Sequence, residues 1–360
     1  MAVSRSSCAR CAPLVEWSAV DERDEAEPMS REPEHPKMIE YDEFGLFGEN
    51  AAEFDLVLDG PPTVRRVAVE VEPGRWLSSL VWGAGEPELV FLHGGAQNAH
   101  TWDTVALALG RPLVAVDLPG HGHSDGGKRG PLALRENARD VATVISALAP
   151  KASGVVGMSL GGATTLSVVA VAPEVVRAVV LVDVTPGVTS GKASAITAFV
   201  NGPESFASFD ELLERTVRFN PTRSVSSLRR GILHNAVQRE DGTWVWRYAR
   251  FRAPEAEPGS GEPEESLGFG SLWDVVSDLN IPIMLVRGMS LGSVVDDADE
   301  AELMRRCPTA RVEHVAGAGH SVQGDAPLEL ARLIGVFLPK GSQTSATLRG
   351  GGHDMKEGGA

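Results

Sequence analysis

Cysteine is scarce in this sequence. Only 3 of the 360 residues are cysteines, Cys8, Cys11 and Cys307. This number is too small for a disulfide framework and favours a reducing compartment. Cys8 and Cys11 form a CxxC, but no second cysteine pair or histidine cluster lies near them in the sequence to complete a metal site. The opening residues also lack the apolar stretch of a signal peptide. We therefore expect a cytoplasmic protein without a metal centre.

Long hydrophobic runs and an excess of basic residues are lacking as well. No apolar stretch approaches the roughly 20 residues that cross a bilayer, so a membrane partner is not expected. The chain has 33 Lys and Arg against 49 Asp and Glu, a formal net charge of -16. Nucleic-acid phosphates are bound by clustered basic side chains, so we expect no nucleic-acid partner. We expect a small-molecule substrate and a monomer or homodimer.

The two ends of the chain differ in composition from its middle. Residues 1–40 are rich in Glu, Arg, Pro and Ser and poor in apolar side chains, which predicts a disordered leader. Residues 341–360 are rich in glycine and predict a flexible tail. The remaining chain forms a predicted core in two parts, 41–188 and 271–340, which are separated by an irregular segment, 189–270.

Short apolar runs alternate with amphipathic stretches in the two parts of the core. Eight runs have the length of strands, and they begin near residues 63, 76, 88, 112, 153, 177, 281 and 310. Most are continuously apolar, as strands buried on both faces of a parallel sheet are, whereas the first two predict an antiparallel pair. The alternation predicts an α/β fold with helices on both faces of the sheet. Ligands of such sheets bind beyond the carboxyl ends of the strands.

Residues 189–270 interrupt this alternation between the sixth and seventh strands. The segment contains two helical stretches and an aromatic one, DGTWVWRYARF. Its position predicts a helical lid over the strand ends. Two interpretations of the aromatic side chains remain open, because they either line a pocket beneath the lid or hold a small subdomain together: Trp244, Trp246, Tyr248 and Phe251.

The sequence GMSLGG at residues 157–162 follows the fifth predicted strand. A GxSxG at a strand-to-helix turn is typical of a nucleophile elbow, in which a strained serine exposes its hydroxyl above the sheet. Gly157 and Gly161 would permit close approach of the backbone, and Ser159 would be the nucleophile. A helix that begins near Leu160 would direct its N-terminal dipole at the site and favour developing negative charge.

Two other glycine-rich turns provide groups that such a serine needs. FLHGGAQ ends the third strand, and a backbone N–H near Gly95 or Ala96 can join that of Leu160 to bind an oxyanion. VAGAGHS places His320 in a loop after the last strand, where it can reach Ser159 as a general base. Other histidines are poorer candidates, because they lie in a predicted structural loop, a helix or a strand: His121, His123, His234 and His314.

The ordered set HGG, DLPGHGHS, GMSLGG, LVDVTP and GAGHS resembles the α/β-hydrolase family over roughly residues 60–338. The resemblance implies an eight-stranded, mostly parallel sheet, a helical lid after the sixth strand, and a serine hydrolase that needs no cofactor. It implies Ser159 as nucleophile, His320 as base, and the N–H groups of Gly95 and Leu160 as oxyanion hole. The residues expected to line the substrate pocket are Gly94, Trp102 and Trp246.

The acid of the triad departs from the family pattern. Many relatives carry it after the seventh strand, but Leu291 occupies that spacing here. Asp183, at the end of the sixth strand, is the favoured acid, and Asp296 or Asp297 is the alternative. Asp117, at the end of the fourth strand, is interpreted as a structural residue that holds its loop.

The serine narrows the expected chemistry. Epoxide hydrolases and haloalkane dehalogenases resemble this chain but need a carboxylate where Ser159 stands, so both are disfavoured. We expect a carboxylesterase or lactonase that acts on a small to medium apolar substrate through an acyl-enzyme. A carbon–carbon bond hydrolase of vinylogous diketones is the next alternative. A non-catalytic ligand-binding relative remains a hypothesis of a different class.

Overall fold

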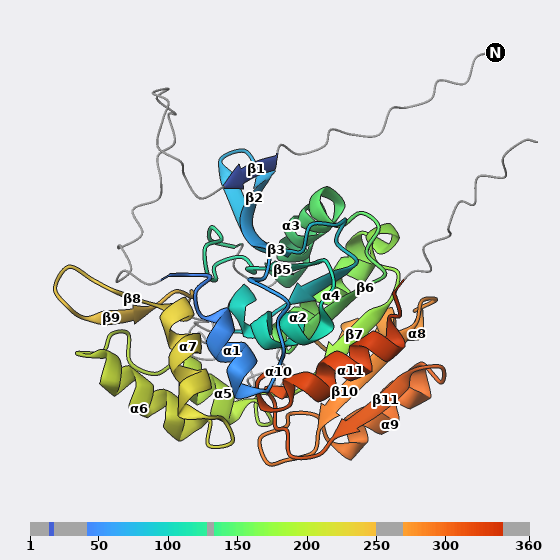
Figure 1. The fold of residues 1–360 in the computed structure, drawn as a ribbon. Helices are drawn as coiled ribbons and strands as arrows, with labels where there is room; N and C mark the ends of the chain where they lie inside the picture. Colours follow the sequence, from blue (N-terminus) through green and yellow to red (C-terminus); the bar gives the residue numbers. More distant parts are fainter. Residues whose placement is uncertain (1–13, 18–41, 128–132, 250–268, 341–360) are drawn as a thin grey trace, which may run out of the picture.

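The computed structural model of the chain describes residues 14–17, 42–127, 133–249 and 269–340. These residues form a nine-stranded sheet in the order β1-β2-β3-β5-β4-β6-β7-β10-β11 and a two-stranded sheet of β8 and β9 (Figure 1). The strands of the large sheet are β1 (Leu14–Trp17), β2 (Val64–Glu72), β3 (Arg75–Trp82), β4 (Leu89–Leu92), β5 (Leu113–Val116), β6 (Gly154–Met158), β7 (Val179–Val182), β10 (Ile283–Gly288) and β11 (Arg311–Val315).

Eight of these strands, β2 to β7 with β10 and β11, are the predicted sheet. The six from β5 to β11 in the sheet order run parallel, and β2 and β3 add to them antiparallel. The ninth strand, β1, pairs antiparallel with β2 and lies within the predicted leader, which was not expected to contain a strand. A four-residue run in a polar segment is too short to show a hydrophobic period. The rest of the leader and the tail 341–360 lie outside the described residues.

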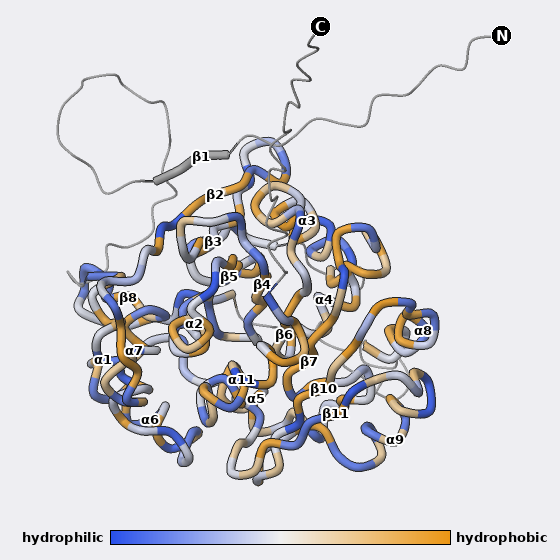
Figure 2. Tube along the Cα trace, turned by 45° about the vertical axis from the view of Figure 1, so that its right-hand side comes forward, coloured by the Kyte–Doolittle hydropathy of each residue, from blue (hydrophilic) through white to orange (hydrophobic). Residues whose placement is uncertain are grey.

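Helices cover both faces of the sheet and form two hydrophobic cores. The first face carries α3 (Ala133–Leu148), α4 (Leu160–Val171), α8 (Leu272–Ser277) and α9 (Asp297–Arg306), and the second carries α1 (Phe47–Glu53), α2 (Asp103–Leu109), α10 (Val322–Asp325) and α11 (Pro327–Phe337). Successive side chains of a strand point to opposite faces, so Val155 of β6 packs into the first core and Val156 into the second. Both faces of the central strands β6 and β7 are buried, and Figure 2 shows that these strands are hydrophobic.

Residues 189–249 form an insertion between β7 and β10, at the lower left of Figure 1. It contains α5 (Ser194–Val200), α6 (Phe209–Phe219), α7 (Val225–Asn235) and a hairpin of β8 (Ala236–Gln238) and β9 (Trp244–Trp246). Ser208 and Ser224 cap α6 and α7 by accepting from backbone N–H groups in their first turns. Trp244 packs in a small core of the insertion, so for this aromatic side chain the subdomain interpretation is correct. Phe251 lies outside the described residues.

The insertion is held against the sheet by contacts to the loop after β4. Asn98 Nδ2 donates to the carbonyl of His234 at 2.9 Å, and Asn235 Nδ2 donates to the carbonyl of Ala96 at 2.8 Å. These bonds join the end of α7 to the HGG loop at the carboxyl edge of the parallel strands. Among the described residues, no helix has both the length and the apolar composition needed to cross a membrane.

Candidate active site

Ser159 occupies the turn between β6 and α4. Its φ of 51° and ψ of -117° lie outside the regions that L-residues commonly adopt. Close packing of the backbone imposes this conformation. A Cβ on Gly157 would lie 2.4 Å from the Gly161 carbonyl oxygen, and a Cβ on Gly161 would lie 2.1 Å from the Leu92 carbonyl oxygen. Both positions therefore require glycine, as the spacing of the motif predicts.

His320 and Asp183 are hydrogen-bonded to each other. Asp183 directly follows β7, has a φ of 46° and is fully buried. Its Oδ2 lies 2.9 Å from His320 Nδ1, which donates the hydrogen bond when Asp183 is ionised. His320 Nε2 is buried and has no hydrogen-bond partner among the described residues. The imidazole is thus oriented by the carboxylate and keeps its second nitrogen available.

Sheet geometry places Ser159 beside Asp183. Met158 is the register partner of Val182, so the next residue of each strand stands level with the other, and Ser159 N donates to the Val182 carbonyl at 3.3 Å. Neighbouring strands are about 4.8 Å apart. Ser159 and Asp183 therefore lie on neighbouring strand ends at one edge of the sheet, and the hydrogen bond to Asp183 brings His320 to the same edge. The hydrogen bond between Ser159 and His320 Nε2 is not formed in this structure.

The last residue of β10 and the loop that follows it surround Asp183 with donors. The Gly288 N–H and the Ser293 hydroxyl donate to its Oδ1, at 3.0 and 2.6 Å, and the Val294 N–H donates to its Oδ2 at 3.0 Å. Sequence reasoning missed the role of Ser293, because only the fold brings this loop to the end of β7.

The alternative acids are engaged elsewhere. Asp296 caps α9, where it accepts from the Asp299 N–H at 3.0 Å, and it pairs with Lys192 at 2.8 Å. Asp297 is 96% exposed and pairs with Arg287 at 2.8 Å. Neither has a hydrogen bond to His320 in the described structure.

The HGG loop passes directly over the serine. A Cβ on Gly94 would lie 2.4 Å from Met158 Sδ and 3.3 Å from Ser159 Cβ, so the backbone of this loop lies close to the serine. The Ala96 N–H donates to His121 Nε2 at 3.2 Å, whereas the Gly95 N–H has no such partner among the described residues. Leu160 is the first residue of α4, and its N–H has no partner within the helix. The structure therefore leaves available the two N–H groups that the sequence predicted.

Neutral histidines support this loop. His93 Nε2 accepts from the Leu118 N–H at 2.9 Å, and its Nδ1 donates to the Gly94 carbonyl at 2.7 Å. Burial, with a smaller contribution from His121, lowers the pKa of His93 to about 3, so the ring stays neutral. The same burial lowers the pKa of His121. The sequence predicts a structural loop at His121 but does not reveal that its ring holds Ala96.

Asp117 has the structural role that the sequence predicts. Its side chain accepts from the Ala99 and His123 N–H groups and forms an ion pair with Arg66 at 2.8 Å. Burial opposes ionisation of Asp117, but the Arg66 guanidinium, the nearby histidines and the hydrogen bond from Ala99 together outweigh it and lower the pKa to about 2. The carboxylate fastens the HGG loop to the loop after β5.

A pocket lies between the insertion and the HGG loop. Its walls include Phe54, Ala96, Gln97, Asn98, His100, Asp103, Phe199, Arg223, Leu228, Arg230, Ile232, His234, Trp246, Ser321 and Gln323. Trp246 lines it as predicted. The prediction for Trp102 is wrong, because this side chain is fully buried and packs on Phe91 with ring centres 4.9 Å apart. Gly94 lies next to the serine and is not part of the wall, so its prediction as a pocket residue is also wrong.

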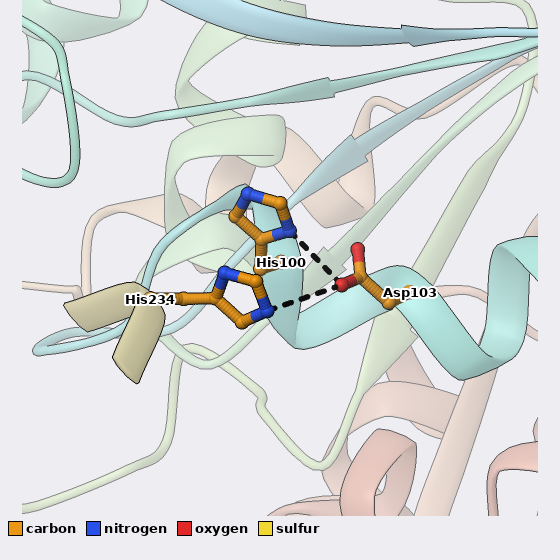
Figure 3. Close-up of side chains that lie close together, drawn as sticks. All are labelled: His100, Asp103 and His234. Atoms are coloured by element: carbon orange, nitrogen blue, oxygen red, sulfur yellow. Dashed lines mark hydrogen bonds and ion pairs between the residues drawn. The ribbon is translucent and has the colours of Figure 1, made fainter. Parts of the chain in front are cut away.

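His100, Asp103 and His234 form a buried cluster in the pocket wall (Figure 3). Asp103 Oδ2 lies 2.9 Å from His100 Nδ1 and 3.8 Å from His234 Nε2. Burial disfavours a charged ring, but Asp103 and Glu43 outweigh it and raise the pKa of His100 to about 9. Burial and the neighbouring His100 hold the pKa of His234 well below its usual value. His100 is therefore the charged ring and His234 the neutral one.

This cluster offers the donor types of a metal site but not the geometry. The two imidazole rings are stacked, with centroids 3.8 Å apart and planes within 8° of parallel. A metal ion lies about 2.0 to 2.1 Å from each ligating nitrogen, along the lone pair in the plane of the ring. Two parallel rings at this separation have no such common point. As the side chains stand, the contact within the cluster that has hydrogen-bond length is the ion pair of His100 with Asp103.

Comparison with known proteins defines the class. The model of the Alpha/beta hydrolase family matches residues 89–333. The chain belongs to the α/β-hydrolase family, which confirms the predicted hydrolase and its fold.

Several relatives are similar over most of their length. The esterase Rv0045c of Mycobacterium tuberculosis is 44% identical over 301 residues, which cover 81% of this chain and 94% of that protein. A crystal structure of that esterase matches with a TM-score of 0.69 and 42% identity, covering 84% of this chain and all of the other. The 2-(acetamidomethylene)succinate hydrolase of Mesorhizobium japonicum is 29% identical over 275 residues, 76% of this chain and 95% of that protein.

Proposed function

We propose that this protein hydrolyses carboxylic esters or lactones through an acyl-enzyme on Ser159. The observation that carries the proposal is the pairing of Asp183 with His320, which leaves His320 Nε2 without a partner at the sheet edge where Ser159 lies. An identity of 44% with an esterase favours ester hydrolysis over the other reactions of serine hydrolases.

Each residue has one role in the reaction. The Ser159 oxygen attacks the carbonyl carbon while its proton passes to His320 Nε2. The imidazolium is stabilised by Asp183, which holds Nδ1–H, and the negative charge on the carbonyl oxygen is bound by the N–H groups of Gly95 and Leu160. His320 gives its proton to the leaving alkoxide, and then takes a proton from water as the water attacks the acyl-enzyme. The acid is released and Ser159 regains its proton.

The pocket supports a small to medium substrate with an apolar body. Its cavity of about 130 Å³ lies between the oxyanion loop, at Ala96, and the loop of the base, at Ser321. Apolar side chains from the insertion form one wall, as a lid over the strand ends would: Phe199, Leu228, Ile232 and Trp246.

A fluorophosphonate probe tests the nucleophile. We expect it to label Ser159, as located by peptide mass spectrometry, and to leave the Ser159→Ala variant unlabelled. A panel of p-nitrophenyl esters of increasing chain length, with lactones and a vinylogous diketone alongside, then tests the substrate class. Absence of labelling, together with no ester turnover, would favour the non-catalytic ligand-binding hypothesis. Turnover of the diketone alone would favour carbon–carbon bond hydrolysis.

A further inference from the structure

Arg223 lies in the pocket wall, on the side of the insertion that faces the loop of the base. It precedes α7 and belongs to the same pocket as Ala96 and Ser321. Its guanidinium packs against Gly324, where an added Cβ would lie 2.7 Å from Arg223 Cζ. Gly324 is in α10, the short helix that follows His320. The guanidinium is therefore near the base without contacting it.

The charge of Arg223 is not neutralised within the protein. The one hydrogen bond of its guanidinium in the described structure goes from Nη2 to the Ser227 hydroxyl at 2.6 Å, and Nε is buried without a partner. No carboxylate of the described residues lies within the 4.0 Å of an ion pair. Burial, which is only partly offset by Asp325 and Glu53, lowers the pKa of Arg223, but the group remains a cation at neutral pH.

The nearest carboxylates are engaged with other groups. Asp325 accepts from the Thr222 hydroxyl at 3.0 Å and from the Gly319 N–H at 2.9 Å. Glu53 forms an ion pair with Arg230, which also donates to Asn50 at 2.8 Å. Arg230 lines the same pocket and has its counterion, whereas Arg223 has none.

A cation that is partly desolvated and lacks a counterion is unfavourable, and an anion that enters the pocket removes this cost. Arginine binds a carboxylate through two parallel hydrogen bonds, which also orient it. We propose that the substrate carries a carboxylate group and that Arg223 binds it while Ser159 attacks the ester carbonyl. The inference rests on the proposed function and makes Arg223 a specificity-determining residue for an ester with an apolar body and one acidic end.

Two matched pairs of esters test this inference. The first compares the mono-p-nitrophenyl ester of adipic acid with p-nitrophenyl hexanoate, and the second compares 4-acetoxybenzoate with 4-methylphenyl acetate. In at least one pair we expect wild type to favour the charged ester in kcat/KM. The ratio should fall about 10 to 100-fold in Arg223→Met, the range for one charge-assisted hydrogen bond. Arg223→Lys keeps the charge and should retain part of the ratio.

The matched control is Arg229→Met. Arg229 lies on α7, is exposed and is not part of the pocket wall, so this variant should keep the wild-type ratio. Turnover of the neutral esters without any preference that depends on Arg223 would overturn this inference but leave the proposed function standing.

A binding measurement separates the two proposals if no ester is turned over. Calorimetry should show adipate binding to Ser159→Ala at least about tenfold more tightly than to the double variant Ser159→Ala with Arg223→Met. Equal affinities, or no binding to either protein, would contradict the carboxylate site.

Discussion

Replacement of Asp183 by asparagine disrupts the four hydrogen bonds that the Asp183 carboxylate accepts. Asp183 Oδ1 accepts from Gly288 N–H and Ser293 Oγ, and Oδ2 accepts from Val294 N–H and His320 Nδ1. An asparagine has one accepting oxygen and one donating nitrogen. Whichever way the amide turns, its NH2 group faces a backbone N–H, because neither Gly288 nor Val294 can reverse its donor.

The expected losses of stability and of kcat follow from the contact between the NH2 group and a backbone N–H. A buried donor that faces another donor costs about 1–3 kcal/mol of unfolding free energy. When the NH2 group takes the place of Oδ2, His320 Nδ1 must accept, and the ring adopts the tautomer that protonates Nε2 and cannot take the proton of Ser159. When it takes the place of Oδ1, the tautomer survives but the imidazolium loses its counterion. We expect kcat to fall about 10,000-fold, the loss typical of this substitution in a serine triad.

The assay compares kcat on a p-nitrophenyl ester for Asp183→Asn, Asp296→Asn and Asp297→Asn, with unfolding by urea to confirm that each variant is folded. Asp296 and Asp297 serve as controls because both have partners remote from His320. The assignment of the acid would be refuted by near-wild-type turnover in Asp183→Asn together with a severe loss in either control.

Two further predictions concern stability. Gly161→Ala places a Cβ 2.1 Å from the Leu92 carbonyl oxygen, so we expect urea unfolding to show that the free energy of unfolding falls by several kcal/mol, on the order of the largest single-residue effects. Gly231→Ala has open space around the added Cβ and should leave the free energy of unfolding close to that of wild type. Equal stability of the two variants would contradict the packing argument. Asp103 and its neighbours raise the pKa of His100 from 6.5 to about 9, so protonated His100 contributes on the order of 3 kcal/mol to the free energy of unfolding. This contribution is complete below pH 6.5. It declines between pH 6.5 and 9, where only the unfolded chain loses the proton, and it is gone above about pH 9. The unfolding free energy should therefore fall with rising pH across this interval in wild type and fall less in His100→Asn, and an identical slope in both proteins would refute the assignment.

Local patterns in the sequence were sufficient to predict eight of the nine strands of the large sheet. Continuous apolar runs with turn residues at their ends identify buried strands from a few neighbouring residues, and GMSLGG and GAGHS identify Ser159 and His320 in the same way. The strand β1 escaped this reasoning because four residues show no period. Trp102 was misplaced because an aromatic side chain near a glycine loop fits a pocket or a core equally well, and only packing on Phe91 distinguishes them.

The sequence by itself predicted eight of the nine strands of the large sheet, and it predicted Ser159 and His320 as the residues that carry the chemistry, because those signals depend on residues adjacent in the chain. The tertiary structure alone decided which carboxylate meets His320 and which charge in the pocket has no partner. Asp183 is the carboxylate that contacts His320 because the strand order β7-β10-β11 brings the loop of Ser293 against the end of β7. Arg223 lacks a counterion because Glu53, distant in sequence, pairs with Arg230 instead. Contacts between remote segments depend on how sheet and insertion pack, and no local pattern records them.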